Sequence, residues 1–491
     1  MAMRDGAAYL AGLRDGRRIW HNGALVDDVT TAPGFAGAAH TIAAYYDFQC
    51  DPAIRDVISY EDEDGERSHL SFKIPRSKED LRNRSAAYAA WAEHTGGQLG
   101  RAPDYMNAAI TGVAAARHHW GQDDPALGEH AAQIHDHCRR NDVCLTHTFI
   151  TPQIDRKTPL GEQEPFLNAG VVKRTSDSII VRGARVLGTL APFSDENLSM
   201  VLPIVSGENE RKYALGFTIP VDAPGLHWVC RDSFDPDRST RDYPISSRFE
   251  EIDTVAVFDD VEVPWENVFD YQDGKIHNMA LMAMRFQESL GHHVIIKNVA
   301  KTRFLLGLAH LIAENAQTNS FINVQIRLGE IVTMLQTLES IAIAAVEGAV
   351  ENPDNGVWYC NANAITAGLR LFPEYYVQII DHIKQIGGSN FMAAPSEANM
   401  EAITEALGPS VERYFKGAAD MKEEGIDKVP LFRLAWDVVG TSLAGRQELY
   451  ERFFFGDQQV SKSQSYLRYD KSEAIDIVRR LLDPDWLSHS S

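Results

Sequence analysis

Residues 144–156, Cys-Leu-Thr-His-Thr-Phe-Ile-Thr-Pro-Gln-Ile-Asp-Arg, interleave polar groups with apolar ones. The β-branched residues and Pro152 favour an extended segment that ends in a turn. Threonine, histidine and glutamine side chains are costly to bury unless each finds a hydrogen-bond partner. A ligand rich in donors and acceptors, such as a flavin ring, would satisfy them. The alternative is a polar strand end that faces solvent.

A second segment, 100–105, places an arginine and a tyrosine near a predicted helix start. Pro103 suits the first turn of a helix, so Arg101 lies just before that turn and Tyr105 lies within it. The two side chains could converge on one pocket. In the alternative interpretation, Arg101 caps a neighbouring helix and Tyr105 is half-buried packing.

The composition excludes several classes of partner. The chain has 491 residues and a net charge of −22, which disfavours nucleic acid and anionic membranes as partners. We find no signal peptide and no run close to the ~18 apolar residues of a membrane span. The five cysteines form no C-x-x-C pair, which indicates reduced thiols in the cytoplasm, without disulfides and without a metal site: Cys50, Cys138, Cys144, Cys230 and Cys360.

The elements that must position these residues fall into three regions. Residues 1–140 are predicted to be mostly helical, with helices near 7–13 and 77–95 and an N-cap at Ser77. Residues 141–270 carry short β-branched runs that predict an antiparallel barrel or sandwich: 178–181, 199–205, 213–220, 226–229 and 254–258. Residues 271–491 predict a helical bundle, because apolar residues recur at spacings of three and four: Val324, Leu328, Ile331, Leu335 and Leu338.

Short motifs occur in a consistent order along nearly the whole chain. They are Trp91-Ala92, Thr95-Gly96-Gly97, residues 100–105, His147-Thr148, Pro152-Gln153, Arg156, Gly183-Ala184-Arg185, residues 258–264 and residues 445–452. Together they resemble the oxygenase family of 4-hydroxyphenylacetate 3-hydroxylase. The resemblance implies an α+β, mainly α fold of the acyl-CoA dehydrogenase type, with a helical domain, a β domain and a helical bundle.

The resemblance also implies an activity. The chain would be the oxygenase component of a two-component monooxygenase, and a separate NAD(P)H:flavin reductase would supply reduced FAD (FADH2) by diffusion. The oxygenase would add O2 to form a C4a-hydroperoxyflavin and would hydroxylate a phenol ortho to its hydroxyl. The hydroxylated ring stays open: free 4-hydroxyphenylacetate, a tyrosine derivative on a carrier protein, a halogenated or nitro phenol, or a hydroxypyridine.

The resemblance assigns roles to specific residues. The catalytic residues are Arg101, Tyr105 and His147, and they would also bind the substrate together with Ile204 and Val205 of the loop 202–206. His147 could accept or share the phenolic proton, while Arg101 and Tyr105 would stabilise the growing negative charge. The implied flavin contacts are His147, Thr148, Phe149, Gln153, Ile154, Asp155, Arg156, Thr189, Ala444, Gly445, Arg446 and Gln447.

The sequence also bears on four alternative functions, the first being a Rossmann-type single-component hydroxylase. No G-x-G-x-x-G follows a strand, which disfavours NAD(P)H binding by this chain. An iron–sulfur and FAD dehydratase of the same fold needs clustered cysteines, and residues 100–105 contain none. The remaining alternatives are an acyl-CoA dehydrogenase, for which no catalytic carboxylate stands out, and a non-enzymatic helical scaffold.

The sequence also predicts a homo-oligomer, namely a dimer of dimers, hence a tetramer. The bundle carries more apolar stripe than one core needs. In related folds a Gln-x-x-Gly-Gly segment reaches the flavin of a neighbouring subunit, and Gln385-Ile386-Gly387-Gly388 matches it.

Overall fold

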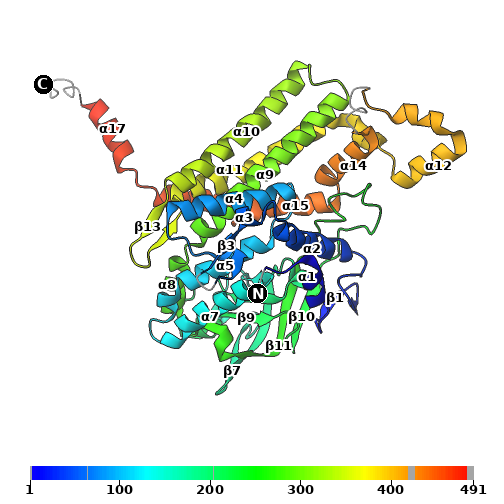
Figure 1. Ribbon diagram of the computed structural model, residues 1–491. Helices are drawn as coiled ribbons and strands as arrows, with labels where there is room; N and C mark the ends of the chain where they lie inside the picture. Colours follow the sequence, from blue (N-terminus) through cyan, green and yellow to red (C-terminus); the bar gives the residue numbers. More distant parts are fainter. Residues whose placement is uncertain (1–2, 63–64, 203, 419–425, 484–491) are drawn as a thin grey trace.

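The structure is a computed structural model that describes residues 3–62, 65–202, 204–418 and 426–483 (Figure 1). Helices occupy most of the first 141 residues: α1 (Gly6–Gly12), α2 (Ala36–Cys50), α3 (Arg55–Ile58), α4 (Lys78–His94), α5 (Pro103–Ala115), α6 (Arg117–Trp120) and α7 (Pro125–Asn141). The same region contains the hairpin of β3 (Ser59–Glu61) and β4 (Arg67–His69) and two short strands, β1 (Ile19–His21) and β2 (Ala24–Leu25).

Two helix starts follow directly from the sequence. Ser77 caps α4, because its hydroxyl accepts a hydrogen bond from the Asp80 amide at 3.1 Å. Pro103 opens α5, where its missing N–H costs nothing. Both predictions are confirmed, and the second one fixes where Arg101 and Tyr105 lie.

The β region consists of two sheets. One has the order β2-β1-β10-β11-β7-β6, with β6 (Gly170–Arg174), β7 (Ser178–Val186), β10 (Leu226–Cys230) and β11 (Thr254–Pro264). The other has the order β12-β9-β8-β5, with β5 (Leu145–Thr148), β8 (Glu196–Met200), β9 (Leu215–Pro220) and β12 (Val268–Tyr271). Most pairs are antiparallel, but β1 pairs with β10 and β5 pairs with β8 in parallel.

The strand predictions were partly wrong in detail. The run 199–205 was predicted as a strand, whereas β8 spans Glu196–Met200. The predicted segment leaves the sheet after Met200, and the Leu202 amide instead donates to the Phe149 carbonyl at 3.4 Å. Strands β6 and β12 were not predicted. The pairing of β1 with β10 could not be predicted from neighbouring residues, because the two strands lie about 200 residues apart in the chain. The domain boundaries at residues 140 and 270 stay a prediction.

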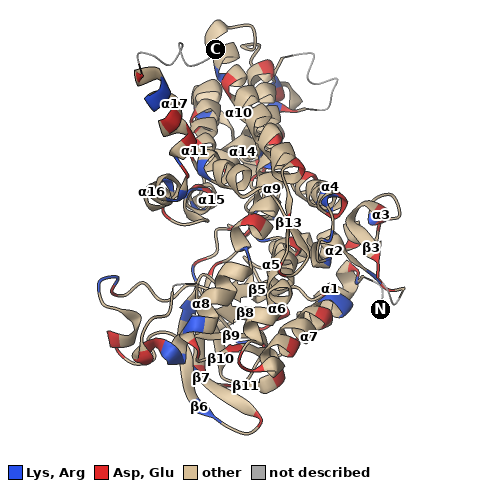
Figure 2. Cartoon of the chain, turned by 90° about the vertical axis from the view of Figure 1, so that its left-hand side faces the viewer, with Lys and Arg blue, Asp and Glu red and all other residues tan. Residues whose placement is uncertain are grey.

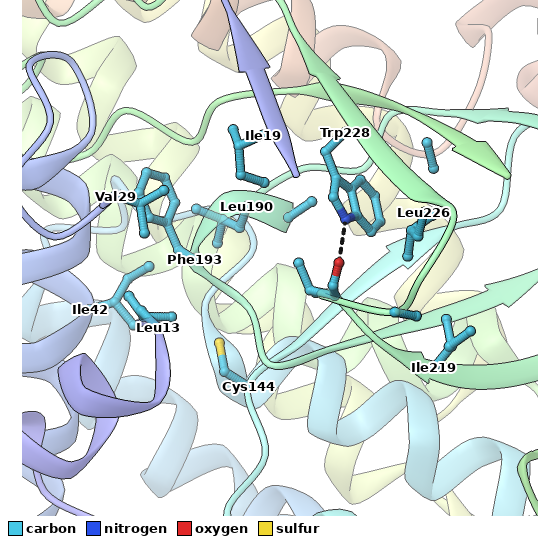
Figure 3. Packing of buried hydrophobic residues seen from close by; sticks show 14 of the residues in the cluster. Leu13, Ile19, Val29, Ile42, Cys144, Leu190, Phe193, Ile219, Leu226 and Trp228 are labelled. Carbon is cyan, nitrogen blue, oxygen red and sulfur yellow. Dashed lines mark hydrogen bonds between the residues drawn. The ribbon is translucent and has the colours of Figure 1, made fainter. Parts of the chain in front are cut away.

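A core cluster joins the N-terminal helices to the β region (Figure 3). Leu13 caps the end of α1 and Ile42 lies in α2, while Phe193 and Trp228 come from the β region. All four side chains are at most 2% exposed. The Trp228 indole N–H donates to the Val221 carbonyl at 3.0 Å. Helices and sheets therefore share one core on this side of the molecule.

The C-terminal region is a bundle (Figure 1). Its long helices are α9 (Phe286–Asn315), α10 (Ile322–Glu347) and α11 (Ala362–Gly387), preceded by α8 (Gly274–Ala283). The hairpin β13 (Val350–Asn352) and β14 (Val357–Tyr359) follows α10, and the chain continues through α12 (Glu397–Leu407), α14 (Lys428–Val439), α15 (Ser442–Phe453), α16 (Gln458–Arg468) and α17 (Ser472–Leu482). Val324, Ile331, Leu335 and Leu338 of the predicted stripe are buried.

By length and composition alone, one helix among the described residues, α10, could cross a membrane. It packs against α9 and α11 in the bundle. Lys and Arg residues are dispersed among Asp and Glu residues over the chain (Figure 2).

Candidate active site

Arg101 and Tyr105 do converge. The Arg101 guanidinium carbon lies 4.8 Å from the centre of the Tyr105 ring and 3.8 Å from that of Phe454. Arg101 Nη1 donates to the Tyr450 hydroxyl at 3.2 Å. The described chain places no carboxylate within ion-pair distance of this guanidinium, whereas several nearby arginines are paired. The result is a half-buried cation held by aromatic rings rather than by an acid.

Gly100 is needed for this arrangement. The Tyr450 hydroxyl donates to the Gly100 carbonyl at 3.1 Å, and a Cβ at position 100 would lie 2.6 Å from the Tyr450 ring. Any side chain here would push Tyr450 away and move the ring that holds Arg101. The glycine before Arg101 therefore has a steric role.

His147 lies on β5, with its ring stacked on that of Phe149 at 4.6 Å. Burial, and after it the nearby Arg101 charge, lower the pKa of His147 to about 3. Its Nδ1 is buried and finds no hydrogen-bond partner within the described residues. The imidazole is thus neutral at ordinary pH, with one ring nitrogen free to exchange a proton.

A buried ion cluster connects the predicted flavin residues Thr189 and Arg446. Arg446 pairs with Glu251 at 2.8 Å and with Asp253 at 2.9 Å, and the Thr189 hydroxyl donates to Asp253 at 2.8 Å. The Arg101 amide donates to Glu251. Burial acts to raise the pKa of Asp253, but Arg446 and then Arg231 outweigh it and hold this pKa below its usual value. Arg446 is therefore satisfied by protein carboxylates.

Helix α9 lines the same region with cationic side chains. Lys301 donates to Gln447 at 3.2 Å, and both Lys297 and Lys301 contact Glu451 at 2.7 Å. Burial lowers the pKa of Lys297 to about 8 against the opposing effect of Glu451. Two lysines thus share one buried carboxylate beside the predicted flavin residue Gln447.

Strand β5 has functional groups on both faces. Thr146 donates to the Thr189 carbonyl at 2.7 Å, and Asn197 of β8 donates to the Thr148 hydroxyl at 3.1 Å. His147 and Phe149 point to the opposite side, where the Phe149 ring lies 6.0 Å from that of Phe286. The predicted strand at the centre of the site is therefore present.

Other predicted contacts lie apart from this centre. Gln153, Ile154, Asp155 and Arg156 are exposed on the loop after β5, and Ile154 is 64% exposed. Ala444 and Gly445 line a separate open cavity together with Lys384 and Thr441. The flavin roles of all these residues stay a prediction.

The predicted substrate loop is divided. Ile204 is 75% exposed, while Val205 is buried and its backbone bonds twice to Asn278 of α8. Pro203 of the same predicted loop lies outside the described residues. Substrate contact by this loop stays a prediction.

Sequence reasoning missed several members of the site. Tyr450 and Phe454 hold Arg101, and Glu251 and Asp253 hold Arg446. Glu251 and Asp253 lie in the acidic segment 250–253, just before β11. This cluster of carboxylates was the feature of the sequence from which a partner for a buried arginine could have been inferred. His293, interpreted from the sequence as a bundle residue, lies 5.4 Å from the Tyr105 ring between ring centres. The described residues include no cluster of three His, Cys, Asp or Glu side chains able to hold a metal ion.

Two protein-family models match this chain, one over the N-terminal helices and the β region and one over the C-terminal bundle. Residues 5–269 match the model of the 4-hydroxyphenylacetate 3-hydroxylase N-terminal family, and residues 278–483 match that of the C-terminal family. The 4-hydroxyphenylacetate 3-monooxygenase oxygenase component of Thermus thermophilus is 38% identical, over 98% of this chain and 97% of that protein.

Solved structures agree with this match. The crystal structure of an oxygenase component of 4-hydroxyphenylacetate 3-monooxygenase, complexed with FAD and 4-hydroxyphenylacetate, superposes with a TM-score of 0.91 at 37% identity, covering 99% of this chain and 100% of that one. An archaeal 4-hydroxybutyryl-CoA dehydratase superposes with a TM-score of 0.86 at 18% identity, covering 98% and 95%, which shows a shared fold alone.

The chain runs through a helical region, a β region and a helical bundle, in that order. This order and the site define a flavoprotein of the acyl-CoA dehydrogenase-like fold, which is α+β and mainly α, as predicted. Within that class, the chain belongs to the 4-hydroxyphenylacetate 3-hydroxylase family. It is an FAD-dependent aromatic monooxygenase of the oxygenase-component type.

Proposed function

We propose that this chain hydroxylates a phenolic ring ortho to its hydroxyl, with reduced FAD delivered by diffusion from a separate NAD(P)H:flavin reductase. The observation that carries the proposal is the unpaired Arg101 cation over Tyr105, with a neutral His147 whose pKa its charge depresses. A cation without an acid partner, next to a neutral base, suits a phenol that becomes a phenolate as it reacts.

The residues present fit a flavin. Ser199 Oγ and Asn197 Oδ1 are buried on β8 without a hydrogen-bond partner for these atoms within the described chain, and they share the sheet face that carries Thr146 and Thr148. Such groups are costly to leave unpaired, so a ring with carbonyl and N–H groups would satisfy them. When bound, reduced FAD would supply the electrons that activate O2, and O2 would supply the oxygen atom that is transferred to the ring.

The protein's own part in the reaction is to position and to move one proton. Arg101 and the Tyr105 hydroxyl hold the phenol oxygen and stabilise its developing negative charge. His147, neutral because its pKa is lowered to about 3, accepts a hydrogen bond from the phenol and shares its proton as negative charge develops on the oxygen. Phe149 and Phe286 cover this side of β5 with apolar rings that exclude water.

One experiment tests the function. The protein is incubated with a flavin reductase, FAD, NADH and a panel of phenols, and hydroxylated product is compared with H2O2. We expect product with at least one phenol and tight binding of reduced FAD, with weak binding of oxidised FAD. FAD that co-purifies in stoichiometric amount and is reduced by NADH alone would contradict the two-component scheme. The panel also decides among 4-hydroxyphenylacetate, carrier-tethered, halogenated, nitro and hydroxypyridine substrates.

A cytoplasmic homotetramer is part of the same proposal. Helix α11 ends at Gly387, and Gly388 adopts a positive φ of 51°. The Gln-x-x-Gly-Gly-like segment 385–388 therefore turns sharply where this helix ends. Gln385 lies one residue from Lys384, which lines the cavity beside Ala444 and Gly445. Sedimentation tests the assembly, and a monomer at micromolar concentration would overturn it.

A further inference from the structure

A carboxylate lies buried directly beside Tyr105. Asp104 is 1% exposed in the first turn of α5, and its amide donates to the Tyr45 hydroxyl at 3.3 Å. His293 Nε2 from α9 lies 3.2 Å from Asp104 Oδ1. Within the described chain, His293 is the one basic group at ion-pair distance from this carboxylate.

The carboxyl group of Asp104 is ionised. Burial alone would raise the pKa of Asp104, but the neighbouring His293 outweighs burial and lowers this pKa. Burial lowers the pKa of His69 to about 4, which leaves that imidazole neutral. A buried carboxylate needs a compensating cation. His293 is the group placed to provide it.

His293 also contacts the ring of Tyr105. The two ring centres are 5.4 Å apart at an interplanar angle of 66°, an edge-to-face contact. On its other side His293 meets the Tyr88 ring of α4 at 4.8 Å and 78°. Its neighbours on α9 are His292 and, one turn further, Lys297. The imidazole is therefore fixed between two tyrosine rings and anchored by Asp104.

We propose that Asp104 and His293 are a positioning pair for Tyr105: Asp104 holds the charged His293 against the Tyr105 ring, which fixes that ring and makes its hydroxyl a stronger donor to the substrate's phenol oxygen. The proposal rests on the proposed function, since it gives Tyr105 its partner. A positive charge near a phenol favours loss of its proton. With Arg101 at 4.8 Å, Tyr105 has two cationic neighbours.

The adjacent histidine provides a matched control. His292 is equally buried, but its Nε2 lies 2.6 Å from the Ser85 hydroxyl and its ring contacts Tyr88. Burial lowers the pKa of His292 to about 3, so it is neutral. His292→Gln thus changes a buried imidazole of α9 without changing the charge near Tyr105.

The first test is a double-mutant cycle on hydroxylation. Asp104→Asn with His293→Gln removes both charges together, so no unpaired charge stays buried. We expect kcat for product to fall ~10–100-fold, as misplaced catalytic groups do, with a smaller change in KM. In a Tyr105→Phe background the same pair of changes should have little further effect. An equal fold-loss in that background would overturn the proposal, because the pair would then act elsewhere.

The second test needs no turnover. With 13C-labelled tyrosine, the NMR titration of Tyr105, assigned through Tyr105→Phe, should move up by about one pH unit in the double variant and should not move in His292→Gln. An unchanged Tyr105 titration in the double variant would overturn the pair's role even if no phenol is hydroxylated.

A measurement on the unaltered protein covers the case in which the double variant does not fold. 15N-histidine NMR at pH 7.5 should show both ring nitrogens of His293 protonated and those of His292 in the neutral pattern. A neutral His293 would overturn the proposal. Absence of product from every phenol, with these NMR results intact, would instead reject the proposed function.

Discussion

The surroundings of the buried histidines near the site divide them into two kinds. His147 and His292 are neutral, since burial lowers the pKa of each to about 3. His293 faces the ionised Asp104 instead. A neutral imidazole can take a proton, whereas a protonated one, as we propose for His293, can only present it, so the same residue type would suit two different tasks.

His147→Ala tests the first of these tasks. The variant should still bind reduced FAD and consume O2, because neither step needs a base at the phenol. Product should fall ~10²–10⁴-fold, with O2 released as H2O2. An oxygen electrode with product analysis measures the ratio. Arg101→Ala should chiefly weaken phenol binding, and Tyr105→Phe should be milder than His147→Ala.

The matched control is His137→Ala, which removes a half-exposed imidazole that pairs with Glu196 on the surface. It should couple O2 to product as the parent does. A His147→Ala protein that does the same would remove His147 from the mechanism, and with it the role of residues 144–156 as the centre of the site.

At the scale of elements, local signals predicted local structure. Ser77, Pro103 and the apolar stripe of α10 each act within one or two helical turns, so their effects could be predicted from neighbouring residues. The partners of Arg446 could not, because Glu251 and Asp253 lie almost 200 positions earlier in the chain. The contact between His293, a buried bundle residue as predicted, and Tyr105 could not be predicted for the same reason, since only packing of α9 on α5 brings the two rings together.

The loop after β8 depends on one side chain of another element. Asn278 of α8 accepts from the Val205 amide at 3.0 Å and donates to the Val205 carbonyl at 2.8 Å. Asn278→Ala removes both bonds, each worth ~1 kcal/mol. Amide hydrogen exchange at Val205 should therefore accelerate roughly 10-fold or more.

The control is Lys275→Ala, an exposed position on the same helix, and it should leave the exchange at Val205 unchanged. Equal protection in Asn278→Ala and the parent would mean that the buried Val205 side chain alone holds the loop. Looser anchoring should also raise the share of O2 released as H2O2 if the loop covers the substrate.

For the whole molecule, the buried neutral histidines predict sensitivity to acid. Burial lowers the pKa of His69 and His135 to about 4 and that of His147 and His292 to about 3. In the unfolded chain each titrates near its usual value of ~6.5, so the unfolded state binds more protons as pH falls through ~6.5. Stability contributed by the neutral forms is present above that pH and is lost below it, by about 2 kcal/mol for each histidine between pH 7 and pH 5.

Denaturant unfolding at pH 7 and pH 5 measures this loss. His135→Gln, which keeps a donor for the Phe72 carbonyl that His135 contacts at 2.9 Å, should shrink the difference between the two pH values by about 2 kcal/mol. A free energy of unfolding that is equal at both pH values would contradict the neutral assignment.

The parallel pairing of β1 with β10 places Ile19 beside Trp228. During synthesis, at ~5–20 residues per second, Trp228 leaves the ribosome about 10–40 s after Ile19. Until then β1 has no strand to join, and the apolar side chains of the first fifty residues, among them Leu13 and Ile42, lack the β-region partners that cover them in the finished protein. A nascent chain with an unpaired strand and uncovered apolar residues is prone to aggregate. Expression of this enzyme should therefore depend on chaperones that bind the growing chain, and slower translation of residues 20–228 should lower the yield of soluble protein.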